Sequence, residues 1–402
     1  LSDRIGHKRL FLAGLPVFAV ASLCAAFSPT AEWLIAARVF LAVGAAMMMP
    51  ATLSIVRHVF TDERERALAI GIWASVASGG AAIGPVVGGL LLEYFWWGSV
   101  FLINVPVVLL VWPLAWKLIP RCGGDNPRPS DIVGSVQIMI GLVGAIYALK
   151  ELSKPTPDVS ALLVAALIGI LFLALFVRRQ QRSAHPMIDF SLFRNRLFAG
   201  GIGVALLSMV ALIGIELVLS QRLQLVLGLS PLQAALFILP IPLASALAGP
   251  VAGLLLPRYG ERSIILGGFV LTTLGIAGLA ALYQSGMALQ LVSLALVGFG
   301  LGGVITAAST AIMLNAPEEK SGMAASIEDV SYELGGVLGV TLLGGLMTAV
   351  YSHSLALPAE LPVNPLAYDS IDEALRLAAG MAADRAQQLT QLARLAFDRA
   401  FI

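Results

Sequence analysis

Long apolar stretches constrain this chain more than any other feature of its sequence. A helix needs about 20 largely apolar residues to cross the hydrocarbon core of a bilayer, and eleven stretches come near that length or exceed it. Overall, 58% of the 402 residues are hydrophobic and only 12% are charged, with a mean hydropathy of +0.89. A soluble protein of this size could not bury so much apolar surface. The sequence therefore predicts an all-α polytopic membrane protein.

Basic residues in the connecting loops set the orientation of the predicted spans, because cytoplasmic loops of membrane proteins carry an excess of Lys and Arg. The loops on the side of Leu1 hold 17 basic residues, and the short loops on the opposite side hold only three. This places Leu1 in the cytoplasm and residues 351–402 on the outer side of a cytoplasmic (inner) membrane. The eleven spans cover residues 10–27, 33–56, 67–92, 99–117, 132–149, 160–177, 198–219, 233–256, 264–282, 289–314 and 322–350.

Composition also narrows the partners that this protein can have. The net charge of +1 gives no reason to expect nucleic acid, and no nucleotide-binding loop of the G-x-x-x-x-G-K type occurs. Cys24 and Cys122 are expected near opposite membrane faces, about 30 Å apart, which is too far for a disulfide. The sequence has no cluster of Cys and His. We therefore expect no metal site, no cofactor and no enzymatic activity.

The sequence repeats itself across its two halves. Residues 1–14 align with residues 255–268, and three glycines of an early glycine-rich stretch align with Gly335, Gly339 and Gly344. The two offsets, 254 and 255, nearly agree, which indicates a duplicated bundle. We expect two pseudo-symmetric helical bundles with the substrate between them. The predicted organisation is a first bundle in 1–118, cytoplasmic loops with two extra spans in 119–197, a second bundle in 198–350 and an extracytoplasmic segment in 351–402.

The segment after the last predicted span has more than one interpretation. Its first part holds Pro358, Pro362 and Pro365, and residues 371–400 carry apolar residues at helical spacing. This pattern fits a surface helix or a helical hairpin. It fits equally well a solvated connector to a further span.

A glycine-rich stretch in the third predicted span has the pattern Gly80-x-x-x-Gly84-Pro85-x-x-Gly88-Gly89. Gly80, Gly84 and Gly88 fall four residues apart on one helix face, where no side chain holds a neighbouring helix away. Pro85 removes a backbone N–H, so the helix can bend there. The stretch predicts either a moving helix contact or a static, tightly packed helix pair with an incidental kink.

Five charged residues fall inside predicted spans, where each costs about 2.5–3.5 kcal/mol at a helix centre. They are Arg38, Glu216, Glu328, Asp329 and Glu333. Asp329 and Glu333 lie one turn apart on one helix face, near the middle of the membrane. Glu216 lies close to the outer end of its span, where its side chain can reach water. Arg38 is either part of a proton network or a structural donor to backbone carbonyls.

The pair formed by Asp329 and Glu333 has the chemistry that proton exchange requires. Two carboxylates one turn apart repel each other when both are ionised, and a low-dielectric site disfavours the charged form. One proton is therefore easily held and easily displaced by an arriving organic cation. Tyr332, beside them in the sequence, either offers an aromatic face to a quaternary nitrogen or packs against other helices.

Several stretches together resemble one family of transporters. The glycine-rich stretch resembles the antiporter motif of drug–proton exchangers, and Arg38 with Gly44 resembles their fourth-helix arginine motif. Residues 1–9 resemble the second half of their cytoplasmic loop motif, and residues 101–106 the start of their sixth span. In the loop motif the acid is Asp3, the turn glycine is Gly6, and the bases are Arg4, Lys8 and Arg9. The whole chain is similar to the 14-span drug:proton antiporter family of the major facilitator superfamily, the QacA/SmvA-type exporters of quaternary ammonium compounds.

This resemblance implies a secondary active transporter that exports lipophilic cationic drugs in exchange for protons by alternating access. Its expected partners are small lipophilic cations, protons and the lipid bilayer. In the family's numbering the chain would hold spans 3 to 13, as a fragment without spans 1, 2 and 14 and without the first-span acid that the family couples to its arginine. Two alternatives stay open: a proton-coupled transporter of another amphipathic molecule or metabolite, and a membrane sensor or scaffold that does not transport.

Overall fold

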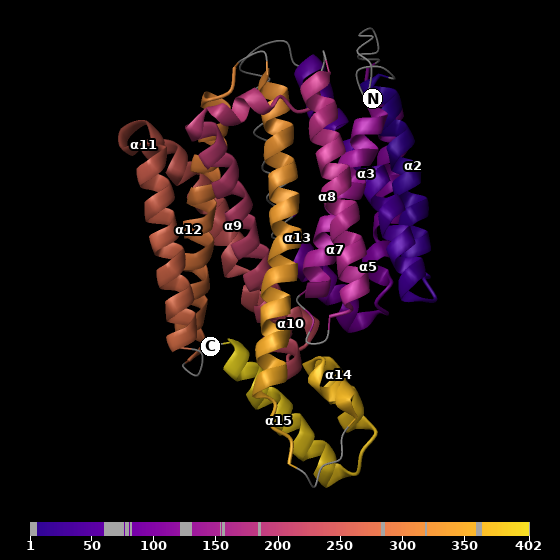
Figure 1. The fold of residues 1–402 in the computed structure, drawn as a ribbon, viewed down its shortest axis with the longest axis vertical. Helices are drawn as coiled ribbons and strands as arrows, with labels where there is room; N and C mark the ends of the chain where they lie inside the picture. Colours follow the sequence, from indigo (N-terminus) through magenta and orange to yellow (C-terminus); the bar gives the residue numbers. More distant parts are fainter. Residues whose placement is uncertain are drawn as a thin grey trace. The chain divides into compact units, whose positions relative to one another are not determined.

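Helices make up the part of the chain that the structure describes (Figure 1). In this computed structural model the described residues are 6–59, 76, 80, 83–120, 131–152, 154, 157–183, 186–282, 286–317, 320–358 and 364–401. Within these ranges the chain contains no strand. The predicted all-α class is confirmed.

The described helices are either long or short, and the short ones lie in the connections and at the ends of the long ones. The long ones are α2 (His7–Ala26), α3 (Ala31–Val59), α6 (Asn104–Leu118), α7 (Ile132–Leu152), α8 (Val159–Arg182), α9 (Arg196–Gln221), α11 (Pro240–Ala281), α12 (Met287–Leu314), α13 (Ser321–Ser354) and α15 (Ala383–Phe401). The short ones are α5 (Ser99–Leu102), α10 (Pro231–Ile238), α14 (Ile371–Ala379), the 3-10 helices η1 (Phe190–Arg194) and η4 (Pro365–Tyr368), and the π-helical turn η2 (Arg222–Val226). A further apolar helix covers Ile83–Tyr94.

The predicted spans correspond to these helices. Nine helical segments of the described chain are long and apolar enough to cross a membrane. One of them, Pro231–Ala281, contains the two predicted spans 233–256 and 264–282, separated by a kink at Gly260. The helix Ile83–Tyr94 is the described end of the predicted span 67–92, most of whose earlier residues lie outside the described ranges.

Two glycines at equivalent positions of the repeat share an unusual backbone conformation. Gly6 has φ 95° and Gly260 has φ 72°, and both start a helix of the repeat. Positive φ of this size is strained for a residue with a Cβ atom. The two residues are 254 positions apart, the offset found by aligning the sequence. The assignment of Gly6 as a turn glycine is therefore consistent with its geometry.

By its contacts the chain divides into two compact units. Unit 1 holds Leu1–Ser130 and Ser230–Ala235, and unit 2 holds Asp131–Leu229 and Leu236–Ile402. In unit 1, α2 packs on α3 through Gly14, where an added Cβ would lie 2.8 Å from Met48 Cγ. The helix α6 packs on α2 around a small core of Leu15, Val108 and Ala115.

In unit 2, α12 is the most enclosed of the long helices and packs on both arms of α11. Gly298 and Gly302 face the arm before Gly260, against the backbone of Ile241 and Ser245. Gly300 faces the arm after it, where an added Cβ would lie 2.5 Å from the carbonyl oxygen of Gly268. Small residues on two faces let three helical segments approach closely, which is the usual way in which membrane helices pack.

The helices α9 and α13 of unit 2 pack side by side through a second glycine face. An added Cβ at Gly339 would lie 2.5 Å from the carbonyl oxygen of Val210, and Gly335 meets the carbonyl of Leu206 in the same way. Gly214 on α9 faces Gly339 in return. Gly335 and Gly339, which align with glycines of the glycine-rich stretch, therefore form a close contact between two helices.

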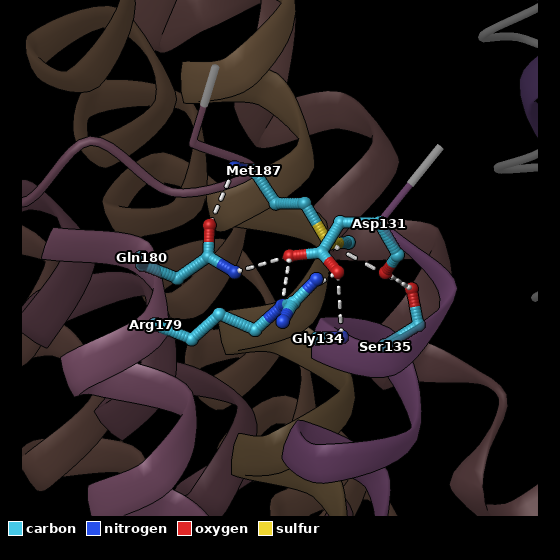
Figure 2. Close-up of polar contacts among 6 residues, drawn as sticks. All are labelled: Asp131, Gly134, Ser135, Arg179, Gln180 and Met187. Carbon is cyan, nitrogen blue, oxygen red and sulfur yellow. Dashed lines mark hydrogen bonds and ion pairs between the residues drawn. The ribbon is translucent and has the colours of Figure 1, made fainter. Parts of the chain in front are cut away.

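The extra spans α7 and α8 form a hairpin held at one end by Asp131 (Figure 2). Asp131 accepts hydrogen bonds from Gly134 N at 2.9 Å, Arg179 Nε at 2.8 Å and Gln180 Nε2 at 3.1 Å. The first two interactions help to hold the pKa of Asp131 below its ordinary value. Gln180, which is 2% exposed, also accepts from Met187 N at 2.6 Å, so the loop after α8 joins the same network.

The segment after α13 is a folded helical hairpin, one of the alternatives that its sequence left open. Helices α14 and α15 enclose a core that includes Tyr351 at the end of α13 and Phe397 of α15. Tyr351 Oη donates to the carbonyl of Ala367 at 3.0 Å. Arg222, only 4% exposed, pairs with Asp398 of α15 at 2.8 Å. The hairpin is therefore tied to the ends of both α9 and α13.

Candidate functional site

Three acidic residues of α13 lie within one stretch of six residues, and their side chains point in two directions. Asp329 and Glu333 are exposed at the surface of their unit and lie one turn apart on one face. Glu328 is only 5% exposed, because each residue along a helix turns by about 100° from the one before it. Glu333 lies 12 residues into the helix, about 18 Å from its start at Ser321. The structure thus brings two of the three predicted acids together.

Glu328 lies among packed side chains and is hydrogen-bonded there. Its Oε1 atom accepts a hydrogen bond from Tyr332 Oη at 2.7 Å. Ser309 of α12 is a second hydrogen-bond partner of the carboxyl group. Tyr332 packs against the buried cluster that contains Phe198, Ile312 and other apolar side chains of α9, α12 and α13. Of the two interpretations of Tyr332, the structure therefore favours packing, with its hydroxyl used inside the bundle.

Glu216 does not join the α13 acids. Gly335 of α13 lies beside Leu206 of α9, and Gly339 lies beside Val210. Residues at the same height on these two helices therefore have numbers that differ by 129. Position 345 of α13 is therefore level with Glu216, about 18 Å beyond Glu333 along the helix. Glu216 is half-buried near the end of α9, where the sequence placed it.

Arg38 belongs to unit 1 and is exposed on α3, next to the buried Ala37. No hydrogen bond or ion pair to its guanidinium is found among the described residues. Both of its predicted roles, in a proton network or as a donor to backbone carbonyls, remain predictions.

The glycine-rich stretch has one close contact among the described residues. No described atom lies within 4 Å of an added Cβ at Gly80, Gly84 or Gly88, so the expectation that Gly84 and Gly88 face another helix stays a prediction. Gly89 makes the close contact instead, because its Cβ would lie 2.8 Å from Leu232 Cα. Pro85 is the third residue of the helix Ile83–Tyr94, and the residues that would show a bend, Ala81 and Ala82, lie outside the described ranges.

A pair of residues beside Gly89 was not singled out from the sequence. Ser230 Oγ donates to Glu93 Oε2 at 2.9 Å, one turn beyond Gly89, and both residues belong to unit 1. Ser230 also caps α10, since its backbone N–H bonds to Gln233 Oε1. The Ser230-Pro231 pattern was the available signal for this cap, but its contact with Glu93 depends on packing that spacing alone does not reveal.

In the cytoplasmic loop motif, Lys8 bonds to backbone carbonyls near the end of α6. Its ammonium group donates to the carbonyls of Trp116 and Ile119, the first at 2.8 Å, at the end of α6. A cation at the C-terminus of a helix satisfies free carbonyls and the negative end of the helix dipole. Arg9 is exposed. Asp3 and Arg4 lie outside the described ranges, so their assignment as the acid and a base of the motif stays a prediction.

The chain is similar in sequence to several curated drug-resistance proteins. It is 44% identical over 400 residues to the methyl viologen resistance protein SmvA of Salmonella typhimurium, an alignment that covers 99% of this chain and 81% of the relative. It is 40% identical over 402 residues to the multidrug efflux pump LfrA of Mycolicibacterium smegmatis, covering 99% and 79%. The family model of the Major Facilitator Superfamily matches residues 1–340.

Solved structures agree on the fold. A peptide transporter POT variant aligns with a TM-score of 0.60 at 16% identity, over 98% of this chain and 80% of that one. A bacterial homologue of the lysosomal transporter Spinster, in an inward-facing conformation, aligns with a TM-score of 0.57 at 15% identity, over 98% and 78%.

Repeated apolar helices with ionisable side chains inside them define a polytopic membrane protein of the transporter class. More specifically, the chain belongs to the Major Facilitator Superfamily. It is thus a multi-pass membrane protein, which in bacteria lies in the inner membrane.

Proposed function

We propose that this protein exports lipophilic cationic drugs across the membrane in exchange for protons, and that Asp329 and Glu333 form the site where the two compete. The observation that carries the proposal is the placement of two exposed carboxyl groups, one turn apart, on a membrane helix. The similarity to the methyl viologen resistance protein supports a cationic substrate, since methyl viologen is a flat aromatic molecule with two positive charges.

The energetics favour competition between cation and proton at this pair. Two opposite charges 4 Å apart attract by about 1 kcal/mol in water and about 4 kcal/mol at the effective dielectric of a partly enclosed site. An ionised carboxylate is costly inside the membrane without such a partner. The pair is therefore stable either with bound protons or with a bound cation, and the binding of one displaces the other.

Alternating access turns this competition into transport. The cation binds from the cytoplasm and releases protons, the site then opens outward, and protons from the outside displace the cation. A cation with two charges needs both carboxylates, whereas a cation with one charge needs only one. The proton gradient supplies the energy, so the proposed cycle requires no nucleotide.

The test is proton release when drug is added to the purified protein in weakly buffered detergent solution. Methyl viologen serves as the divalent probe and tetraphenylphosphonium as the monovalent one. We expect Asp329→Asn and Glu333→Gln each to lose most of the release caused by methyl viologen and less of that caused by tetraphenylphosphonium. Glu216→Gln is the matched control, because its carboxyl lies about 18 Å farther along the bundle. If both α13 variants release as many protons as the parent protein, the coupling site lies elsewhere.

Two other functions give different results in defined experiments. A transporter of another amphipathic molecule or metabolite would catalyse counterflow of that molecule in proteoliposomes, without proton release on addition of either cation. A sensor or scaffold would bind a ligand but show no counterflow of any substrate. The membership in a transporter family favours the first of these over the second.

A further inference from the structure

The third acid of α13 is oriented away from the proposed exchange pair, although it adjoins Asp329 in sequence. Glu328 and Ser331 are buried at 5% and 6% exposure, and Ile327 is buried beside them. Asp329 and Glu333 are exposed. The same helix thus has one carboxyl group buried inside unit 2 and two carboxyl groups exposed at its surface.

Burying a carboxyl group inside a membrane bundle is costly unless donors satisfy it. Glu328 has two hydroxyl partners, Tyr332 of its own helix at 2.7 Å and Ser309 of α12. The bond to Ser309 joins two helices, and Tyr332 is itself packed against the cluster shared by α9, α12 and α13. A rotation of α13 about its axis would break the bond to Ser309 and move the carboxyl group into apolar surroundings, whereas the bond to Tyr332 lies within α13 and turns with it.

We propose that Glu328 is a positioning residue: its hydrogen bond with Ser309 of α12 fixes the rotation of α13, with Tyr332 orienting the carboxyl group, and so aims Asp329 and Glu333 in one direction. The effect of Glu328 on transport rests on the proposed function, whereas its effect on the rotation of α13 does not. Glu328 itself touches neither the cation nor the exchanged proton. Its role requires an acceptor oxygen at this position and not a negative charge.

The variants separate positioning from exchange. Ser309→Ala and Glu328→Leu remove the bond between α13 and α12, and Glu328→Gln keeps an acceptor oxygen at this position. Ser331→Ala is the matched control, because Ser331 is a buried hydroxyl of the same helix that bonds only within α13, to the carbonyl of Ile327 at 2.7 Å.

The first measurement is methyl viologen–induced proton release as a function of drug concentration. We expect Ser309→Ala and Glu328→Leu to raise the half-saturating concentration about five- to tenfold, the effect of one lost buried hydrogen bond, with the maximal release unchanged. Glu328→Gln and Ser331→Ala should match the parent. A maximal release reduced by Glu328→Gln, as by Asp329→Asn, would overturn the proposal, because Glu328 would then be an exchanging group.

The second measurement does not depend on transport. Val337, which is 42% exposed, lies one turn beyond Glu333 on the same face. In a Val337→Cys reporter, maleimide labelling at position 337 is followed by peptide mapping. We expect Ser309→Ala and Glu328→Leu to change the labelling rate severalfold and Glu328→Gln to leave it at the parental value. An unchanged rate in all variants would overturn the proposal even if the parent released protons normally, and a changed rate would uphold it even if no proton release occurred.

Discussion

At the scale of single residues, one ion pair of unit 2 joins the loop before α9 to the start of α13. Lys320 Nζ lies 2.5 Å from Asp189 Oδ2, and Asp189 also accepts from Ser191 N at 2.8 Å. The hydrogen bond from Lys320, followed by that from Ser191, lowers the pKa of Asp189 from 3.8 to about 2. At ordinary pH the pair therefore holds the start of α13 to the segment that precedes α9.

Substitution of Asp189 should have a small, pH-dependent effect on stability. A carboxyl group whose pKa is lowered by folding stabilises the folded state fully above its unfolded pKa and loses this contribution as pH falls through the folded value. Lys320 is 36% exposed, so solvent screening limits the loss in Asp189→Asn to about 1 kcal/mol or less. Thermal unfolding in detergent should show this difference at pH 5 and 7 and a smaller one near pH 3. A difference that grows toward pH 3 would contradict the assignment.

Part of the candidate site could be predicted from the sequence and part could not. The three acids of α13 were predictable, because charge inside a membrane span is costly and has to have a reason. Their separation into a buried Glu328 and an exposed pair was not predictable. It depends on how α13 is rotated against α9 and α12, and that rotation is set by packing between segments distant in sequence. Lys8 is a similar case, since its partners on α6 lie more than 100 residues away.

At the scale of helices, the contact between α9 and α13 depends on glycines at chosen positions. An added Cβ at Gly339 would lie 2.5 Å from the carbonyl oxygen of Val210 and 3.1 Å from its Cα atom. At Gly336, on the same helix, the nearest atom would be Ile213 Cγ1 at 3.5 Å, an ordinary contact. One glycine is therefore required by the helix approach, and its neighbour is not.

Alanine substitution should separate these two glycines. Gly339→Ala forces a backbone contact apart and should destabilise the protein by about 1–3 kcal/mol. Gly336→Ala should be neutral or stabilising by up to about 1 kcal/mol, because alanine favours a helix where space allows it. Chemical or thermal unfolding of both variants in the same detergent measures the difference. Equal stability of the two variants would mean that α9 and α13 do not touch at Gly339.

The helices themselves were the most predictable part of the fold. Each backbone polar group in a bilayer must be satisfied within its own segment, so long apolar stretches have few alternatives to a helix. The Asp131 network and the hairpin of α14 and α15 lie outside that constraint. Their hydrogen bonds join residues such as Arg222 and Asp398, far apart in sequence, and the apolar spacing of residues 371–400 left the hairpin as one of several alternatives.

At the scale of the whole molecule, the repeat gives equivalent glycines unequal surroundings. Gly335 and Gly339 are packed against α9, whereas their repeat partners Gly80 and Gly84 have no described atom within 4 Å of an added Cβ. Gly89, in contrast, is close-packed against Leu232. A glycine face that is open in one arrangement of a transporter is free to close in another. We therefore propose that the face at Gly84 is used during the transport cycle and not for folding.

Substitution of Gly84 by leucine tests this proposal against a static role. Because the position is open here, Gly84→Leu should leave membrane insertion and thermal stability close to those of the parent. If the face closes on another helix during the cycle, the leucine side chain blocks close approach and reduces drug efflux from cells severalfold. Gly267→Leu is the matched control, since Gly267 of α11 is another helical glycine with no atom within 4 Å, and it should transport normally. Parental efflux by Gly84→Leu, at parental protein levels, would show that the glycine face does not move against a neighbour.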